Sequence, residues 1–185
     1  MLRHDFIATA EDSLLLIVDF QENLLKVMDG WQELAQRMIQ LAQAAALMQV
    51  PVVVTEQYKK GLGATHAPLL AEIDAPRVMD KEHFSACLEP DFLPAVHGLG
   101  RKKIIVVGME AHVCVLQTCL DLIQAGFQVH LVVDAVSSRT AANRQTGIEL
   151  MRQAGVLVSS TETVIFQWAC RANTELFRQV LPIVK

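Results

Sequence analysis

The chain has 185 residues, of which 52% are hydrophobic and 19% are charged, and its formal net charge is −4. This length is enough for a substantial core, so we expect a single domain over residues 1–185. A mildly acidic chain without clusters of Lys and Arg offers no favourable surface to nucleic acid or anionic lipid, so neither is an expected partner.

The N-terminal residues, "MLRHDFIATAED", lack the apolar stretch of a secretion signal. Charged residues also interrupt each hydrophobic run well before the roughly 20 residues that a membrane-spanning helix needs. We therefore expect a soluble protein in the cytoplasm.

Apolar runs of strand length recur along the chain, and most are apolar on both faces. This pattern is typical of parallel strands that helices cover on each side. Helix-period segments lie between the runs and end near Gly or Pro. The alternation predicts right-handed crossovers in a three-layer α/β/α domain. The expected strands are 14–19, 50–56, 77–81, 103–108, 129–135 and 155–160, and clear helical segments are 31–49, 115–126 and 140–155.

A segment rich in Gly, Pro and charge, "QYKKGLGATHAPLLAEIDAP", occupies residues 57–76 between the second and third expected strands. Loops of this size in a compact domain tend to be functional or to lie at an interface. Its "GLGAT" lacks the third glycine of a dinucleotide fingerprint, and the chain has no GxxxxGK[ST] motif. No nucleotide or other cofactor is therefore expected.

Polar residues stand at or just after the ends of three expected strands: Asp19, Lys81 and Cys114. In open parallel sheets the ligand crevice lies outside the carboxyl ends of the strands, so these side chains can converge there. Each also has an ordinary interpretation. Asp19 could cap a helix, Lys81 could be a solvated charge, and Cys114 could be a buried hydrophobe.

Cys114 ends the stretch "GMEAHVC", which joins an expected strand to the helix that follows it. Only a thiolate is a good nucleophile, and a helix N-terminus and the Lys81 cation both favour it. Asp19 would then accept the thiol proton. The turn resembles a nucleophile elbow, whose backbone N–H groups can form an oxyanion hole. Cys119, deeper in the same helix, is expected in the core, and the Cys and His spacings do not indicate zinc.

The sequence resembles the isochorismatase-like cysteine hydrolase superfamily through "LLLIVDFQ", "DKEHFSA" and "GMEAHVCVLQTCLDLIQAGFQVHLVVDAVSSR". The similarity covers nearly the whole chain and is greatest to isochorismatase domain proteins of bacteria and animals. It implies a six-stranded parallel sheet in the order 3-2-1-4-5-6 and a catalytic triad of Asp19, Lys81 and Cys114. It also implies a cis peptide between Met109 and Glu110, with the N–H groups of Glu110 and Cys114 as the oxyanion hole.

Two departures from the family pattern bear on the substrate. Nicotinamidases carry metal-binding Asp and His residues after their second strand, where this chain has "TEQYKKG". We therefore expect no bound metal and do not expect nicotinamide as the substrate. Many relatives carry a Thr and an acidic residue where this chain has Ala111 and His112, so His112 is expected to change the polarity of the pocket. Phe84 and His112 are the expected pocket walls, although Phe84 could equally serve packing.

These observations predict a metal-independent hydrolase that acts on a small amide or related acyl compound through a thioester at Cys114. The alternatives are isochorismatase-type vinyl ether hydrolysis, with Asp19 as the acid, a thiol redox protein, and a binding protein on the same fold. Members of the family assemble into oligomers, and the helix after Cys114 has only a narrow polar stripe of Gln117, Asp121 and Gln124. A homo-oligomer is therefore expected.

Overall fold

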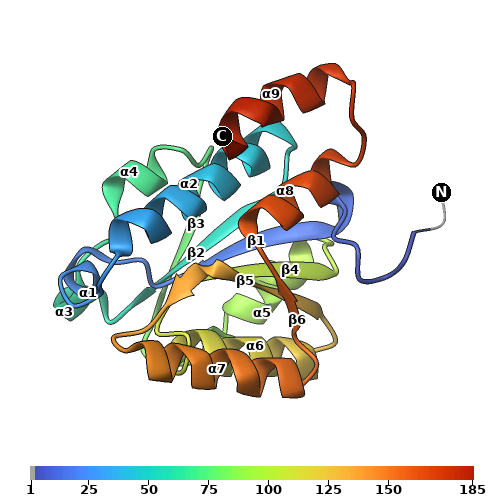
Figure 1. Cartoon of the computed structure of the whole chain (residues 1–185). Helices are drawn as coiled ribbons and strands as arrows, with labels where there is room; N and C mark the ends of the chain where they lie inside the picture. The colour runs from blue at the N-terminus through green and yellow to red at the C-terminus, as the bar shows by residue number, and fades with distance from the viewer. Residues whose placement is uncertain (1–2) are drawn as a thin grey trace.

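The computed structural model describes residues 3–185 as one six-stranded parallel sheet with helices on both faces (Figure 1). The strands are β1 (Ser13–Val18), β2 (Val52–Gln57), β3 (Arg77–Lys81), β4 (Lys103–Met109), β5 (Gln128–Ser137) and β6 (Leu157–Ser159). The α-helices are α1 (Glu22–Leu25), α2 (Trp31–Leu47), α3 (Lys59–Leu62), α4 (Ala67–Leu70), α5 (Phe92–Gly98), α6 (Cys114–Gln124), α7 (Ala141–Gln153), α8 (Thr161–Ala169) and α9 (Glu175–Val184). Two short 3-10 helices are η1 (Ala10–Asp12) and η2 (Ala86–Leu88).

The strand order is β3-β2-β1-β4-β5-β6, so the expected fold class and strand order are confirmed. β1 pairs with β2 on one side and with β4 on the other. The chain therefore leaves β1 and β4 toward opposite edges of the sheet, and the loops that follow them part at the carboxyl ends of the strands. This is where a ligand crevice is expected in such a sheet.

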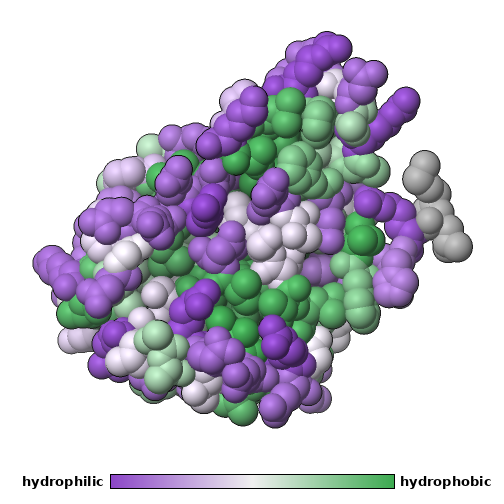
Figure 2. All heavy atoms as spheres, in the orientation of Figure 1, coloured by the Kyte–Doolittle hydropathy of each residue, from purple (hydrophilic) through white to green (hydrophobic). Residues whose placement is uncertain are grey.

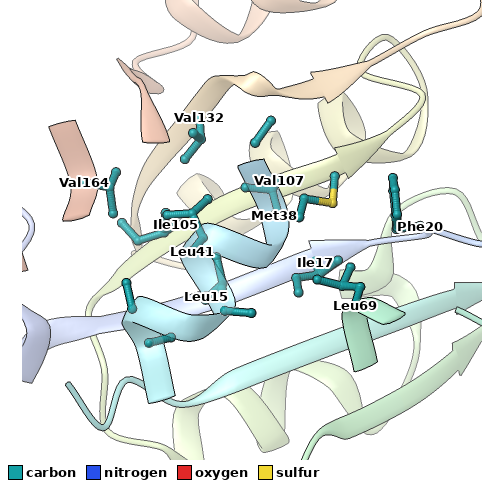
Figure 3. Packing of buried hydrophobic residues seen from close by; sticks show 14 of the residues in the cluster. Leu15, Ile17, Phe20, Met38, Leu41, Leu69, Ile105, Val107, Val132 and Val164 are labelled. Atoms are coloured by element: carbon teal, nitrogen blue, oxygen red, sulfur yellow. The ribbon is translucent and has the colours of Figure 1, made fainter. Parts of the chain in front are cut away.

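Two hydrophobic clusters, one on each face of the sheet, form the core. α2, α4, α8 and α9 cover one face, and α5, α6 and α7 cover the other. Successive side chains of β1 alternate between the clusters. Leu15 and Ile17 lie in one cluster with Met38 of α2 (Figure 3). Leu14 and Leu16 belong to the cluster on the opposite face. Burying each of these side chains contributes about 1.5–3 kcal/mol, which explains why β1 is apolar from Leu14 to Val18.

The C-terminal helices α8 and α9 were not predicted, although the sequence carries a start signal for each. The Ser160 hydroxyl accepts a hydrogen bond from the N–H of Thr163, and the Thr174 hydroxyl accepts one from the N–H of Phe177. Both are N-cap interactions. Trp168 of α8 then donates from Nε1 to the Ser13 hydroxyl at 3.0 Å, which ties this segment to the first strand.

The excursion after β2 contains the short helices α3 and α4 and is fastened to β2 by a buried carboxylate. Glu56, 1% exposed, accepts hydrogen bonds at Oε1 from the Thr65 N–H (2.7 Å) and hydroxyl (2.9 Å). Its Oε2 lies 2.7 Å from Lys59 Nζ. Both ends of the segment 59–65 are thereby held against the carboxyl end of the sheet. Among the helices of residues 3–185, none has the length and apolarity that crossing a bilayer requires.

Candidate active site

Asp19 directly follows β1 and is 1% exposed. Its Oδ1 accepts a hydrogen bond from Thr55 Oγ1 at 2.7 Å, and its Oδ2 lies 2.8 Å from Lys81 Nζ. Burial raises the pKa of Asp19, against the opposing effects of the Lys81 charge and the Thr55 hydroxyl. The carboxylate does not cap α1, because that helix has Gln21 as its N-cap residue and no side-chain cap.

Lys81 is the last residue of β3 and is 3% exposed, so it is not a solvated charge. Besides Asp19, its ammonium donates to Gln57 Oε1 at 2.6 Å and to the carbonyl oxygens of Phe84 at 3.1 Å and His83 at 3.3 Å. A buried charge is tolerated when it is paired and hydrogen-bonded in this way.

Cys114 is the first residue of α6, and its thiol reaches Gln57 Oε1 at 3.9 Å. Burial, and after it the charge of Asp19, raises the pKa of the Cys114 thiol to about 12, although Lys81 acts in the opposite direction. Burial therefore opposes the thiolate that the helix N-terminus and the Lys81 cation favour. Cys119 is fully buried in the core, as expected.

The turn between β4 and α6 depends on Gly108, whose φ is 141°. A Cβ atom there would lie 2.2 Å from the carbonyl oxygen of Val18, so only glycine lets the two central strands approach this closely. The peptide bond between Met109 and Glu110 is trans, and the expected cis bond is wrong. The chain turns instead through Glu110 in a left-handed conformation, with φ of 57°.

The backbone amides at this turn divide into paired and unpaired groups. The N–H groups of Ala111, Val113 and Val115 donate to backbone carbonyls. Those of Glu110 and Cys114 have no hydrogen-bond acceptor within residues 3–185. A helix does not use the amides of its first turn, so the Cys114 N–H is free for a ligand. Two such donors are the components of an oxyanion hole.

Asp19 and Cys114 line a pocket of about 280 Å³ at the carboxyl ends of the strands. A larger groove of about 740 Å³ runs along β3 and α5, but it contains none of the three candidate residues, so we assign the site to the smaller pocket. Phe84 is among the lining residues of the smaller pocket. In the described part of the chain, no three His, Cys, Asp or Glu side chains are grouped as metal ligands. The lining residues are Asp19, Leu24, Gln57, Leu62, Phe84, Met109, Glu110, Val113, Cys114 and Arg139.

A charged cluster forms one wall of this pocket. Glu110, 9% exposed, lies with its Oε1 2.8 Å from Arg139 Nε and its Oε2 3.2 Å from His112 Nδ1. The same imidazole nitrogen lies 3.0 Å from the Ser138 hydroxyl. His112 is not among the lining residues, contrary to the expectation that it forms a wall, so it meets the pocket only through Glu110.

Sequence reasoning missed Gln57, Thr55 and Arg139. Gln57 ends β2, so the rule that selected Asp19 and Lys81 from strand ends applies to it as well. Arg139 stands two residues after β5, so the same rule reaches it. Thr55 carried no comparable signal, because only the folded chain brings its hydroxyl to Asp19.

A family model described as the isochorismatase domain matches residues 13–163. The chain is 42% identical over 149 residues to the secreted isochorismatase effector Isc1 of Phytophthora sojae, an alignment that covers 78% of this chain and 71% of that protein. It is 32% identical over 176 residues to isochorismatase domain-containing protein 2A of Mus musculus, which covers 95% of this chain and 84% of the relative.

Solved structures give the same architecture. A structure described as the MAR1 ribonuclease of Caenorhabditis elegans superposes with a TM-score of 0.91 at 34% identity, covering 96% of this chain and 91% of that one. YcaC of Escherichia coli, described as an octameric hydrolase of unknown specificity, superposes with a TM-score of 0.89 at 23% identity, covering 98% and 94% of the two chains. At that identity the second likeness shows the fold alone.

Proposed function

Because the chain belongs to the isochorismatase family, whose members are generally hydrolases, we propose that it hydrolyses a small amide or related acyl compound through a thioester at Cys114. One observation carries this proposal. Asp19 and Cys114 come from separate parts of the sequence and line one pocket, and Lys81 pairs with Asp19 and shares Gln57 Oε1 with the Cys114 thiol. A buried carboxylate beside a buried thiol is the pairing of base and nucleophile that covalent catalysis requires.

Acylation begins with a neutral thiol, so proton transfer accompanies attack. Asp19 takes the proton from Cys114, and the sulfur bonds to the substrate carbonyl carbon. The carbonyl π electrons move to oxygen, and the free amides of Glu110 and Cys114 bind this oxyanion. The oxyanion then collapses, the carbon–nitrogen bond breaks, and Asp19 returns its proton to the departing amine. Lys81 orients the Asp19 carboxylate and offsets its charge.

Deacylation uses the same groups in the reverse roles. Asp19 removes a proton from water, and the resulting hydroxide attacks the thioester carbonyl. The carbon–sulfur bond breaks, the sulfur regains a proton from Asp19, and a carboxylic acid leaves. The net reaction is amide plus water to acid plus amine, and no step requires a metal or cofactor.

The pocket supports a small substrate with an apolar portion. Its volume of about 280 Å³ is near the lower end of the range for small-molecule sites, about 300–1,000 Å³. The apolar part of the pocket wall is formed by Leu24, Leu62, Phe84 and Val113. Arg139 pairs with Glu110 through Nε, and its side chain is 60% exposed, so the remaining guanidinium donors can bind an acceptor group of the substrate.

Hydrolysis of a panel of small amides and ureides by wild type and Cys114→Ala tests the proposal. We expect turnover by wild type and a loss of at least about 10³-fold in Cys114→Ala and in Asp19→Asn. Cys170→Ala, which removes an exposed thiol, is the matched control and is expected to keep full activity. Mass spectrometry of acid-quenched enzyme should find the acyl group on Cys114. A substrate hydrolysed equally well by wild type and Cys114→Ala would refute the mechanism.

Vinyl ether hydrolysis is the second candidate, and the raised pKa of Asp19 favours it, because burial makes this carboxyl a proton donor nearer to neutral pH. That reaction needs the acid but not the thiol. Activity retained in Cys114→Ala and lost in Asp19→Asn, with a vinyl ether as substrate, would assign this reaction. The opposite pattern with an amide would assign the first.

Nucleic acid remains disfavoured as a substrate for this chain. The pocket charges balance, since Asp19 pairs with Lys81 and Glu110 pairs with Arg139, and the formal net charge is −4. Binding to a polyanion depends on a concentration of Lys and Arg that neutralises phosphates. We therefore propose a small-molecule substrate.

We also propose self-association. Leu116, Leu120 and Ile123 of α6 are only partly buried, and Leu150 and Val158 are exposed. Figure 2 shows apolar side chains gathered around β6 and between α8 and α9. Sedimentation velocity measures the oligomeric state directly, and a monomer at micromolar concentration would contradict the proposal.

The four free cysteines support a reducing compartment such as the cytoplasm.

A further inference from the structure

Gln57 connects the nucleophile to the buried cation, although the mechanism above assigns it no role. It is the last residue of β2, and its side chain lines the pocket. The single oxygen Oε1 accepts a hydrogen bond from Lys81 Nζ at 2.6 Å and is the acceptor for the Cys114 thiol at 3.9 Å. The ammonium and the thiol therefore share one neutral acceptor.

The orientation of the Gln57 amide is fixed by its other contacts. Its Nε2 donates to the carbonyl oxygen of Glu82 at 2.8 Å. Its backbone N–H donates to Gln21 Oε1 at 2.8 Å, and Gln21 Nε2 donates back to the Gln57 carbonyl at 3.1 Å. Rotating the amide would place its N–H groups against the Lys81 ammonium, so Oε1 must face the site. Gln21 is fully buried and holds this arrangement from the turn after β1.

We propose that Gln57 is a positioning residue that favours the protonated Cys114 thiol, because its Oε1 offers the thiol a neutral acceptor and at the same time engages the Lys81 ammonium. The thiol proton is stabilised by an acceptor that carries no charge, and the cation that would favour a thiolate is engaged by the same oxygen. The nucleophile is then unreactive until substrate enters and Asp19 takes the proton. This inference builds on the proposed role of Cys114 as nucleophile.

Four other charged side chains lie around the site, each at or after the end of a different strand. Substitutions at Gln57 leave all four in the sequence. Asp19 follows β1 and Lys81 ends β3, while Glu110 and Arg139 follow β4 and β5 and line the pocket. Changing Gln57 alone alters the acceptor and leaves these charges in place. Two substitutions then make opposite predictions. Gln57→Met is similar in size and has no acceptor oxygen, whereas Gln57→Glu adds a negative charge beside the sulfur.

The experiment measures the rate at which iodoacetamide alkylates Cys114 between about pH 6 and pH 9, where this rate is proportional to the thiolate fraction, and peptide mass spectrometry identifies the labelled residue. Exposed Cys170 is the internal reference in every sample, and fully buried Cys119 reports unfolding. In Gln57→Met we expect about 10-fold faster alkylation of Cys114 at each pH in this range, which is the change that a fall of about one pH unit in the pKa of the thiol produces. In Gln57→Glu we expect slower alkylation of Cys114 over the same range. Gln117→Met, the same change at an exposed position of α6, should match wild type.

The proposal would be overturned if the alkylation rates of Cys114 in the two Gln57 variants equalled the wild-type rate or changed in the same direction, because a merely structural role predicts no opposite changes. A variant in which Cys119 is labelled has unfolded, and Gln57→Asn then replaces it, since the shorter side chain withdraws the oxygen from both partners and should act like Gln57→Met. The outcome is independent of hydrolysis. Amide turnover that survives Cys114→Ala would remove the proposed function without changing the labelling result.

Discussion

At the scale of single residues, the site is a set of buried polar atoms that satisfy one another. Asp19 and Lys81 are 1% and 3% exposed, and each would be costly to bury alone. The Thr55 hydroxyl and the Gln57 amide complete their hydrogen bonds. Removing one partner therefore changes the protonation of the others as well as stability.

Thr55→Val tests this coupling at Asp19. The valine has nearly the same shape but lacks the hydroxyl that donates to Oδ1 at 2.7 Å. That hydrogen bond favours the carboxylate, so its loss raises the pKa of Asp19 further. Because Asp19 must be ionised to accept the thiol proton, the acidic limb of the pH profile of kcat/KM should move to higher pH. We also expect a loss of about 1 kcal/mol in unfolding free energy.

Thr146→Val is the control for that variant. Thr146 is exposed on α7, and its hydroxyl donates only to the carbonyl of Ala142 in the preceding turn. Its pH profile should coincide with that of wild type. If Thr55→Val also leaves the acidic limb in place, the titrating base is not Asp19.

At the scale of secondary-structure elements, α7 supports the nucleophile turn from outside. Gly147 is buried in α7, and a Cβ atom there would lie 2.6 Å from the Ala111 carbonyl oxygen and 2.9 Å from His112 Cα. These neighbours are backbone atoms of the turn that carries Glu110 and Cys114. Because a backbone cannot move aside as a flexible side chain does, helix and turn must separate if Gly147 gains a methyl group.

Gly147→Ala should therefore lower both stability and turnover. We expect a loss of about 1–3 kcal/mol in the free energy of unfolding measured in urea, the usual cost of overpacking. The lower kcat follows from displacement of the oxyanion donors. Gly98→Ala in α5 is the matched control, because beyond its chain neighbours and its own helix backbone no atom lies within 4 Å of its Cβ position, and it should be neutral or stabilising by up to about 1 kcal/mol. Equal behaviour of the two variants would show that α7 does not constrain the turn.

At the scale of the whole molecule, a buried histidine links the stability of the sheet to pH. His130 of β5 is 2% exposed, and its Nε2 lies 3.1 Å from Gln128 Oε1. Burial, with a smaller effect of the nearby Lys103 charge, lowers the pKa of His130 from 6.5 to about 4. The folded chain therefore holds the neutral imidazole at a pH where the unfolded chain is already protonated.

The sign of this linkage sets the pH window. The stability that His130 contributes as a neutral group is fully present above about pH 6.5 and is lost as the pH falls toward 4, because the unfolded state binds the extra proton. Urea unfolding should show wild type losing up to about 3 kcal/mol more than His130→Gln over this range. His4→Gln, at an exposed position, should follow wild type. Parallel curves for wild type and His130→Gln would contradict the assignment.

Much of the architecture was predictable because it follows from local patterns. Doubly apolar runs predicted the parallel strands, helical periodicity predicted α2, α6 and α7, and the motif resemblance supplied the strand order. The helices α8 and α9 were not named, although Ser160 and Thr174 offered cap signals. Strand ends also pointed to Asp19, Lys81 and Cys114, since parallel strands bring their carboxyl ends to one edge.

The amino-acid sequence by itself determined which residues stand at that edge, because side-chain periodicity and strand termination are properties of the chain read along its length. Only the tertiary structure decided their electrical state and their neighbours. The burial that raises the pKa of the Cys114 thiol, the place of Gln57 between thiol and ammonium, and the pairing of Glu110 with Arg139 all arise between distant segments. Desolvation depends on everything packed around a group, and no local pattern records it.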